Sequence, residues 1–160
     1  MEVQLRETVA GDLPILFAHQ ADPVASTMAA FPSRDWDAFV AHQAKIQADP
    51  EVVTRAVVAG GEVVGAIGSF TIDDAREVGY WIGRDHWGRG IATAALRALL
   101  VLEPVRPLWA HVAAHNVGSR RVLEHCGFAV VREQRVDGVD EFLTRLETPD
   151  AGGAQAKGGS

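Results

Sequence analysis

Residues 85–96, which read DHWGRGIATAAL, have the composition of an anion-binding turn. They follow a run of residues typical of a β-strand, and their second half has the spacing of a helix. Gly88 and Gly90 permit positive φ angles and leave room for a ligand beside the main chain. The first amides of a helix lack backbone acceptors and lie at the positive end of its dipole, so they bind anions. We therefore predict a phosphate site here, to which Arg89 and Thr93 can add a charge and a hydroxyl.

This glycine turn does not match the common nucleotide-binding motifs. The dinucleotide pattern G-x-G-x-x-G is incomplete, and the Gly-Lys-Ser/Thr ending of a P-loop is missing. A short glycine motif can also serve only to tighten the connection between a strand and a helix. Taken by itself, the turn leaves both a phosphate site and a plain structural connection open.

A second polar group lies in residues 115–128, HNVGSRRVLEHCGF. Asn116 precedes a helical pattern whose first turn contains Ser119, and Gly127 followed by Phe128 has the form of a helix C-cap and a core residue. Asn116 and Ser119 can both direct polar atoms toward the cavity that the glycine turn would border. Helix capping would explain Asn116 equally well.

Together, the two segments resemble the GNAT superfamily of acyl-CoA-dependent N-acetyltransferases. Residues 87–92, WGRGIA, are similar to the family motif Gln/Arg-x-x-Gly-x-Gly/Ala. Asn116 and Ser119, with Gly-Phe at 127–128, are similar to its later Asn-x-x-Ala/Ser helix that ends in Gly-Phe. The expected order of elements agrees with the family from residue 3 to about residue 147.

Residues 77–96 also resemble one branch of that family, the ribosomal-protein N-terminal (alanine/serine) acetyltransferases. A Gly-Tyr-Trp strand and a Trp-Gly-x-Gly turn are usual in this branch. Trp87 stands where the wider family has Gln or Arg, and the branch shares this departure. The resemblance therefore still implies pyrophosphate binding at the turn.

The resemblance implies acetyl-CoA as co-substrate, with no metal. The pantetheine arm would pair with exposed strand backbone like an added strand, and the pyrophosphate would bind the amides of the glycine turn. The residues implied in coenzyme binding are Tyr80, Trp81, Ile82, Trp87, Gly88, Arg89, Gly90, Ile91, Ala92, Thr93, Asn116 and Ser119.

One departure from the family pattern concerns the leaving group. Many members have a tyrosine eight positions into the Asn helix, as general acid for the thiolate. Leu123 occupies that position here, and Tyr80, the single tyrosine of the chain, lies elsewhere. The thiolate would be protonated by water, by another group, or not at all.

Direct attack on a thioester requires a neutral amine, and an alkyl ammonium with a pKa near ~10 must first lose a proton. Glu77, His111 and His115 are candidates to accept that proton, directly or through water. We predict Glu77 and His111 as catalytic residues, with Glu77 ranked first because the resembled branch often has an acidic residue near this position. A solvated carboxylate and a structural histidine remain the alternatives. A route through an acetylated Cys126 lacks a base partner in the sequence.

The acceptor pocket is expected in residues 23–39, which combine apolar residues with a few charges. Phe31, Arg34 and Trp36 are the predicted substrate-binding residues. Helical spacing also allows Trp36 to be a core residue, and a solvated surface position is the alternative for Arg34. The sequence does not name the acceptor.

The predicted function is transfer of an acetyl group from acetyl-CoA to a primary amine, on a peptide N-terminus or a small molecule. The reaction would run by direct attack in a ternary complex. Two alternatives stay open: a non-catalytic acyl-CoA-binding sensor on the same fold, and a plain structural or interaction domain.

Composition sets the class of protein. The 160 residues are 48% hydrophobic and 22% charged, as in a globular domain, and the net charge of −6 argues against non-specific nucleic-acid binding. One cysteine permits no internal disulfide. With no secretory signal and no apolar run long enough for a bilayer, we expect a cytoplasmic protein without a membrane partner. The resemblance alone allows a homodimer.

The elements that must position these residues form a single domain at 1–148, followed by a flexible tail at 149–160. Strands are expected at 3–8, 52–58, 62–70, 76–82, 108–114, 128–136 and 139–147, and helices at 12–20, 36–48, 90–102 and 116–125. Residues 21–33, with two prolines, read as a loop with at most a short helical turn. The fold class is α/β, or α+β. It has a mixed, mostly antiparallel sheet of about six or seven strands, a splayed parallel pair and about four flanking helices.

Overall fold

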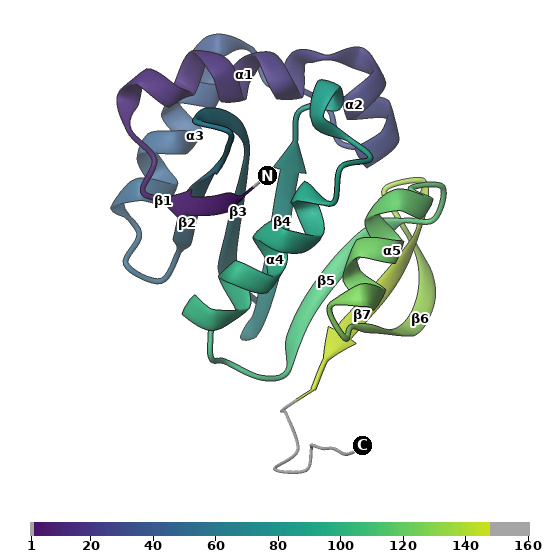
Figure 1. Ribbon diagram of the computed structural model, residues 1–160. Coiled ribbons are helices and arrows are strands. Elements are labelled where there is room, and N and C mark those ends of the chain that lie inside the picture. Colours follow the sequence, from purple (N-terminus) through teal and green to yellow (C-terminus); the bar gives the residue numbers. More distant parts are fainter. Residues whose placement is uncertain (1, 148–160) are drawn as a thin grey trace.

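Seven strands form one mixed sheet in the order β1-β2-β3-β4-β5-β7-β6 (Figure 1). The computed structural model describes residues 2–147, so the predicted tail at 149–160 lies outside the described residues. The strands are β1 (Val3–Arg6), β2 (Val53–Ala59), β3 (Glu62–Ile72), β4 (Ala75–Ile82), β5 (Leu108–Ala113), β6 (Ala129–Val136) and β7 (Val139–Leu146). The helices are α1 (Leu13–Ala21), α2 (Pro23–Ala29), α3 (Trp36–Ala48), α4 (Ile91–Leu102) and α5 (Val117–His125). This architecture confirms the predicted fold class.

The only parallel neighbours in this sheet are β4 and β5; the other pairs are antiparallel. A single residue pair, Glu77 with Trp109, registers the two parallel strands. Beyond that pair β4 continues to Ile82 and β5 to Ala113 without further pairing. We call this unpaired part the open end of the β4–β5 pair, and the opposite part, where β4 and β5 begin, the closed end.

Helices cover both faces of the sheet (Figure 1). On one face α4 packs against β1, β3 and β4, and α5 packs against β5; on the other α1 packs against β3 and β4, with α3 beside it. The apolar residues of α4 recur at helical spacing, and Ile91, Ala95, Leu96 and Leu99 are all buried in the main core. This stripe fixes the rotation of α4, and therefore where its first turn lies.

The closed end is held by a buried ionic network. Glu103, between α4 and β5, is 2% exposed and accepts hydrogen bonds from Ser69 Oγ at 2.6 Å and Arg76 Nε at 2.8 Å. The second carboxylate oxygen of Glu103 accepts a hydrogen bond from the Val105 amide. Burial opposes the charged form, but the bonds from Ser69 and Arg76 lower the pKa of Glu103 below its usual value. The network ties β3, β4 and the approach to β5 together.

Residues 21–33, predicted as a loop, contain the helix α2. Asp22 caps it by accepting a hydrogen bond from the Val24 amide, and Pro23 occupies its first position, where a missing amide costs nothing. Ala30 ends it in the left-handed region. Of the two prolines that indicated a loop, Pro23 begins a seven-residue helix and Pro32 follows it, and tertiary packing stabilises this helix despite its length.

Within the described residues, no helix is long and apolar enough to cross a membrane.

Candidate functional site

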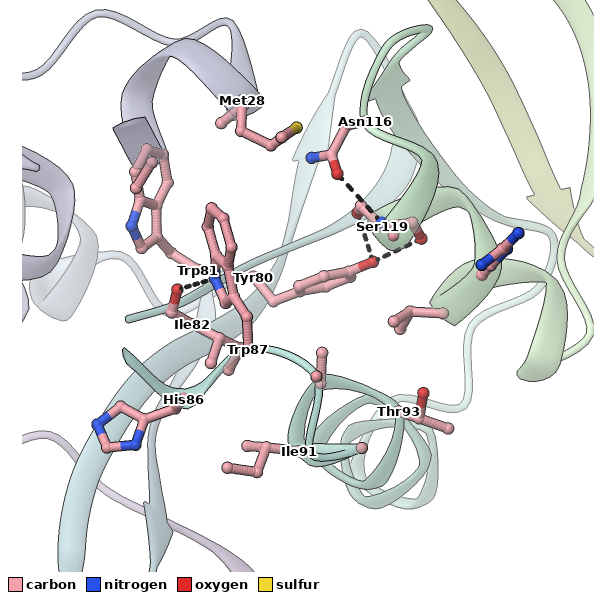
Figure 2. Close-up of a pocket in the computed structure, with 18 of the residues that line it drawn as sticks. Met28, Tyr80, Trp81, Ile82, His86, Trp87, Ile91, Thr93, Asn116 and Ser119 are labelled. Atoms are coloured by element: carbon pink, nitrogen blue, oxygen red, sulfur yellow. Dashed lines mark hydrogen bonds between the residues drawn. The ribbon is translucent and has the colours of Figure 1, made fainter. Parts of the chain in front are cut away.

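The open end borders a pocket of about 450 Å³ between α2, α4 and α5 (Figure 2). Eleven of the twelve residues predicted to bind the coenzyme line it, and Arg89 is the exception. The lining residues are Ala25, Met28, Ala29, Tyr80, Trp81, Ile82, His86, Trp87, Gly88, Gly90, Ile91, Ala92, Thr93, Asn116, Gly118, Ser119, Arg121, Val122 and His125. The fold therefore brings both polar segments of the sequence to one cavity.

The glycine turn has the geometry of an anion cradle. Gly88 and Gly90 have φ angles of +77° and +76°, and a Cβ built on either would meet no atom within 4 Å. The first hydrogen bond of α4 runs from the Ala94 amide to the Gly90 carbonyl, at 3.1 Å. The amides of residues 91–93 precede it and have no acceptor within the helix. Open space therefore faces main-chain donors at the positive end of a twelve-residue helix.

Trp87 orients this turn. Its indole Nε1 donates a hydrogen bond of 2.8 Å to the carbonyl of Ile82, at the end of β4. A tryptophan in this position thus fastens the turn to the strand, while its exposed ring borders the pocket. It also occupies one acceptor site of the Ile82 carbonyl. The Trp81 carbonyl lies against Gly65 of β3, so the backbone of Tyr80 is the part that faces the unpaired edge and is free for a pantetheine arm.

Three basic side chains of the pocket were not predicted from the sequence. His86 precedes the glycine turn, and Arg121 and His125 lie one turn apart on α5. The i, i+4 spacing of Arg121 and His125, on the helix that begins after Asn116, was the available signal. The Arg121 guanidinium and the two imidazoles, next to free helix amides, are groups that can bind a phosphorylated ligand.

Tyr80 extends from β4 across the pocket to the first turn of α5 (Figure 2). Its Oη lies 2.7 Å from Ser119 Oγ and 3.1 Å from the Ser119 carbonyl. Burial raises the pKa of Tyr80 to about 12. Asn116 Oδ1 accepts a hydrogen bond from the Ser119 amide, so Asn116 is the N-cap of α5 and its amide group is the part left for a ligand.

Glu77 and His111 meet on the other side of the sheet. Side chains alternate along a strand, so Glu77 shares with Trp81 the face opposite Tyr80. Trp81 Nε1 donates to the His19 carbonyl of α1, which identifies that face. His111 Nε2 lies 3.5 Å from Glu77 Oε1 on the neighbouring strand. This pair sits where the two parallel strands separate.

A second carboxylate completes the cluster. Glu141, on β7, lies 2.5 Å from His111 Nδ1, so the imidazole stands between two carboxylates. Glu141 also accepts a hydrogen bond from Gln134. The hydrogen bond to Glu77 raises the pKa of His111, partial burial opposes this rise, and the bond to Glu141 adds to it. Together they bring the pKa of His111 to about 9. The imidazole is therefore protonated at neutral pH and becomes a proton acceptor only as the pH approaches 9.

The remaining base candidate, His115, contacts a different element. Its Nε2 lies 3.0 Å from the carbonyl of Thr27 in α2, so this nitrogen acts as a donor. The contact connects α2 to the start of α5, on either side of the pocket. Cys126 is half-buried with its Sγ near the Thr93 carbonyl, and burial raises its pKa, which does not favour a thiolate nucleophile.

None of the three predicted acceptor residues lines the pocket. Phe31 contacts Trp81 edge-on with ring centroids 6.5 Å apart, and the Arg34 guanidinium lies 5.3 Å from the Phe31 ring. Trp36 is 42% exposed and packs edge-on against Phe17, beside a small second core. Phe31 is therefore the one that contacts a pocket residue, and Trp36 is partly a packing residue.

The sequence matches a family model described as an acetyltransferase (GNAT) domain over residues 2–129. The chain belongs to the GNAT acetyltransferase family. No curated protein sequence matches this GNAT chain.

Solved structures share the fold of this GNAT domain at low identity. An N-acetyltransferase from Staphylococcus aureus Mu50 has a TM-score of 0.80 and 19% identity, covering 93% of this chain and 100% of its own. Spermidine N-acetyltransferase from Vibrio cholerae, in complex with CoA and spermine, has a TM-score of 0.80 and 18% identity, covering 91% and 95%. AAC(6')-Ib in complex with acetyl-CoA has a TM-score of 0.75 and 18% identity, covering 92% and 94%.

Proposed function

We propose that this protein transfers an acetyl group from acetyl-CoA to a primary amine. One observation carries the proposal: an anion cradle and a proton-accepting cluster lie on opposite faces of β4, at the place where β4 and β5 separate. A thioester arm can reach the gap from the α4 side, and an amine can reach it from the α1 side. Membership of the GNAT family supports the same reaction.

The residues around the cradle fit the phosphate end of coenzyme A. The main-chain amides of residues 88–93 would hold the pyrophosphate, with Arg121 adding positive charge and His125 a hydrogen-bonding imidazole. The Asn116 amide group would bind the pantetheine arm, and the free edge of β4 at Tyr80 would pair with it. Bound there, coenzyme A supplies the activated acetyl group, and the protein supplies position and proton transfer.

The Glu77–His111 pair is the proposed proton acceptor. An alkyl ammonium has a pKa near ~10. An imidazole with a pKa of about 9 is well matched to such an amine, whereas an isolated carboxylate is a far weaker base. The developing oxyanion would be stabilised by a main-chain amide of β4 at the edge that β5 leaves unpaired.

The acceptor is an amine of a peptide N-terminus or of a small molecule. The resemblance of residues 77–96 to the ribosomal-protein branch favours a peptide α-amine, and the fold is shared with a spermidine N-acetyltransferase. The total charge of −6 attracts either kind of cationic acceptor at long range.

An acceptor screen with thiol release as readout tests the proposal. The panel contains α-amino peptides beginning with alanine or serine, polyamines, aminoglycosides and free amino acids. We expect amine-dependent release of coenzyme A with at least one class. Tight binding of acetyl-CoA without turnover of any amine would contradict an enzyme and support the acyl-CoA sensor instead. Absence of binding would contradict both.

A further inference from the structure

Tyr80 is a polar group that the proposed reaction has so far left without a task. Its ring is largely buried in the wall of the pocket, yet its hydroxyl ends at Ser119 beside the cleft (Figure 2). The inference below rests on the proposed function, because it concerns the thiol that acetyl transfer releases.

Tyr80 and Glu77 lie on opposite faces of β4. The two residues are three apart on the strand, about 10 Å along it, and alternation places their side chains on opposite faces. A coenzyme arm bound in the pocket would bring its sulfur to the α4 and α5 side of the sheet, which is the side that the Tyr80 hydroxyl occupies.

Other polar groups of the pocket lie elsewhere along it. Thr93 and His86 border the glycine turn, at the phosphate end. Asn116 Oδ1 accepts from the Ser119 amide, and its remaining amide group is the one proposed to hold the pantetheine arm. Leu123, one turn after Ser119 on the same face of α5, is apolar and 1% exposed. The Tyr80 hydroxyl, hydrogen-bonded to Ser119 at the first turn of α5, is the candidate group for the sulfur.

We propose that the Tyr80 hydroxyl donates a hydrogen bond to the sulfur of coenzyme A and stabilises the thiolate as it leaves. In the reaction the amine nitrogen forms a bond to the carbonyl carbon, the carbon–sulfur bond breaks, and its electron pair remains on sulfur. The Tyr80 hydroxyl turns from the Ser119 carbonyl to that sulfur, while Ser119 Oγ donates to the phenol oxygen and holds the ring in place.

The phenol keeps its proton throughout. With a pKa of about 12, Tyr80 is far less acidic than an ordinary thiol near ~8.5, so full proton transfer to the thiolate is unfavourable. A preorganised hydrogen bond to the developing charge is the contribution that remains. The thiolate then takes its proton from water in the open cleft, and the amine proton leaves through Glu77 and His111.

The pKa of the bound coenzyme A thiol tests this inference without any acceptor. It is read from thiolate ultraviolet absorbance across a pH titration, with desulfo-coenzyme A as the blank. We expect the bound thiol to titrate roughly one to two pH units higher in Tyr80→Phe than in the unaltered protein. An equal thiol pKa in the two proteins would overturn the role of Tyr80. Failure of the unaltered protein to bind coenzyme A would instead overturn the proposed function.

A second measurement uses the fact that Tyr80 is the single tyrosine of the chain. Growth on 3-fluorotyrosine places one fluorine in the protein, in the wall of the cleft, with almost no change of shape. We expect its resonance in the coenzyme A complex to shift with pH at the midpoint of thiol ionisation, and to show no such shift with desulfo-coenzyme A. A resonance unaffected by thiol ionisation would overturn the inference even if Tyr80→Phe did not fold.

With an acceptor in hand, Tyr80→Phe is expected to lower kcat about 10- to 100-fold while the KM for acetyl-CoA stays unchanged. A lower affinity with unchanged kcat would assign Tyr80 to packing instead.

Discussion

The two ends of the β4–β5 pair use polar groups in opposite ways. At the closed end Glu103, Arg76 and Ser69 bind one another, with Glu103 and Ser69 buried in the protein interior. At the open end the first amides of α4 have no helical acceptor, and the edge of β4 has no strand beside it. At the closed end, polar groups that bond to one another hold the strands together. At the open end the strands separate, and their hydrogen-bond donors remain available to a substrate.

The two faces of β4 also differ in the charge of their side chains. The face of β4 that carries Tyr80 borders a largely apolar pocket, to which the glycine turn adds main-chain amides and Arg121 adds a positive charge. The opposite face carries the Glu77, His111 and Glu141 cluster. Alternation along a single strand thus places the proposed anion-binding surface and the proposed proton-accepting surface on opposite faces of the sheet.

The largest expected effect is a loss of stability when the ionic network at the closed end is broken. Glu103→Ala removes the buried acceptor that Arg76 and Ser69 share, although Arg76 keeps its bonds to the Glu51 carbonyl and Thr71. We expect the free energy of unfolding to fall by about 3 kcal/mol. Urea denaturation measures it. The matched control is Glu124→Ala, which breaks an exposed i, i+4 pair with Arg120 and should cost about 0.5 kcal/mol or less. Equal losses in the two variants would remove the closed end as an anchor.

The next effect concerns the cradle at the open end. Gly90→Glu places a carboxylate where the pyrophosphate would bind, and we expect acetyl-CoA affinity to fall at least about 100-fold, or about 2.7 kcal/mol. Gly138→Glu is the control, because Gly138 has a φ of +80° and equally open surroundings in a distant hairpin. Calorimetric titration compares the two. The cradle assignment fails if both variants bind acetyl-CoA alike.

The proton-accepting cluster is expected to respond more moderately. Glu77→Gln should lower kcat roughly 10- to 100-fold with little change in acetyl-CoA affinity. It should also shift the rising limb of the pH–rate profile to lower pH, because the Glu77 bond helps to hold the His111 pKa at about 9.

Glu141→Gln is the matched variant for Glu77→Gln, since Glu141 contacts the same imidazole from the other side. It should shift the limb in the same direction with a smaller loss of the limiting rate. An unshifted profile in both variants would exclude His111 from proton transfer.

The smallest effect is on stability as a function of pH. The His111 pKa is about 9 in the folded protein and near 6.5 when unfolded, so the charged imidazole stabilises the fold fully below pH 6.5. This contribution is lost as the pH rises toward 9. The stability difference between the unaltered protein and His111→Gln should shrink across that window. Partial exposure of His111 limits it to about 1 kcal/mol or less. A constant difference would contradict the raised pKa.

Sequence patterns predicted the fold class and most of the pocket. The spacing of apolar residues and the residues typical of turns are local signals. The strands of the sheet, α4 with its glycine turn, and the Asn116 cap could therefore be predicted from them. The helix α2 was missed because its two flanking prolines indicate a loop, and only its packing against β5 and α1 shows its place. Glu103 and Glu141 were missed because their partners lie 34 and 30 residues away, and no local spacing shows such contacts.

A crystal structure of the complex with coenzyme A tests the central claim most directly. The account predicts the pyrophosphate on the amides of residues 88–93, and the thiol in the gap between β4 and β5 within hydrogen-bonding distance of the Tyr80 hydroxyl. Coenzyme A bound elsewhere, or a glycine turn closed by side chains of the protein itself, would contradict it.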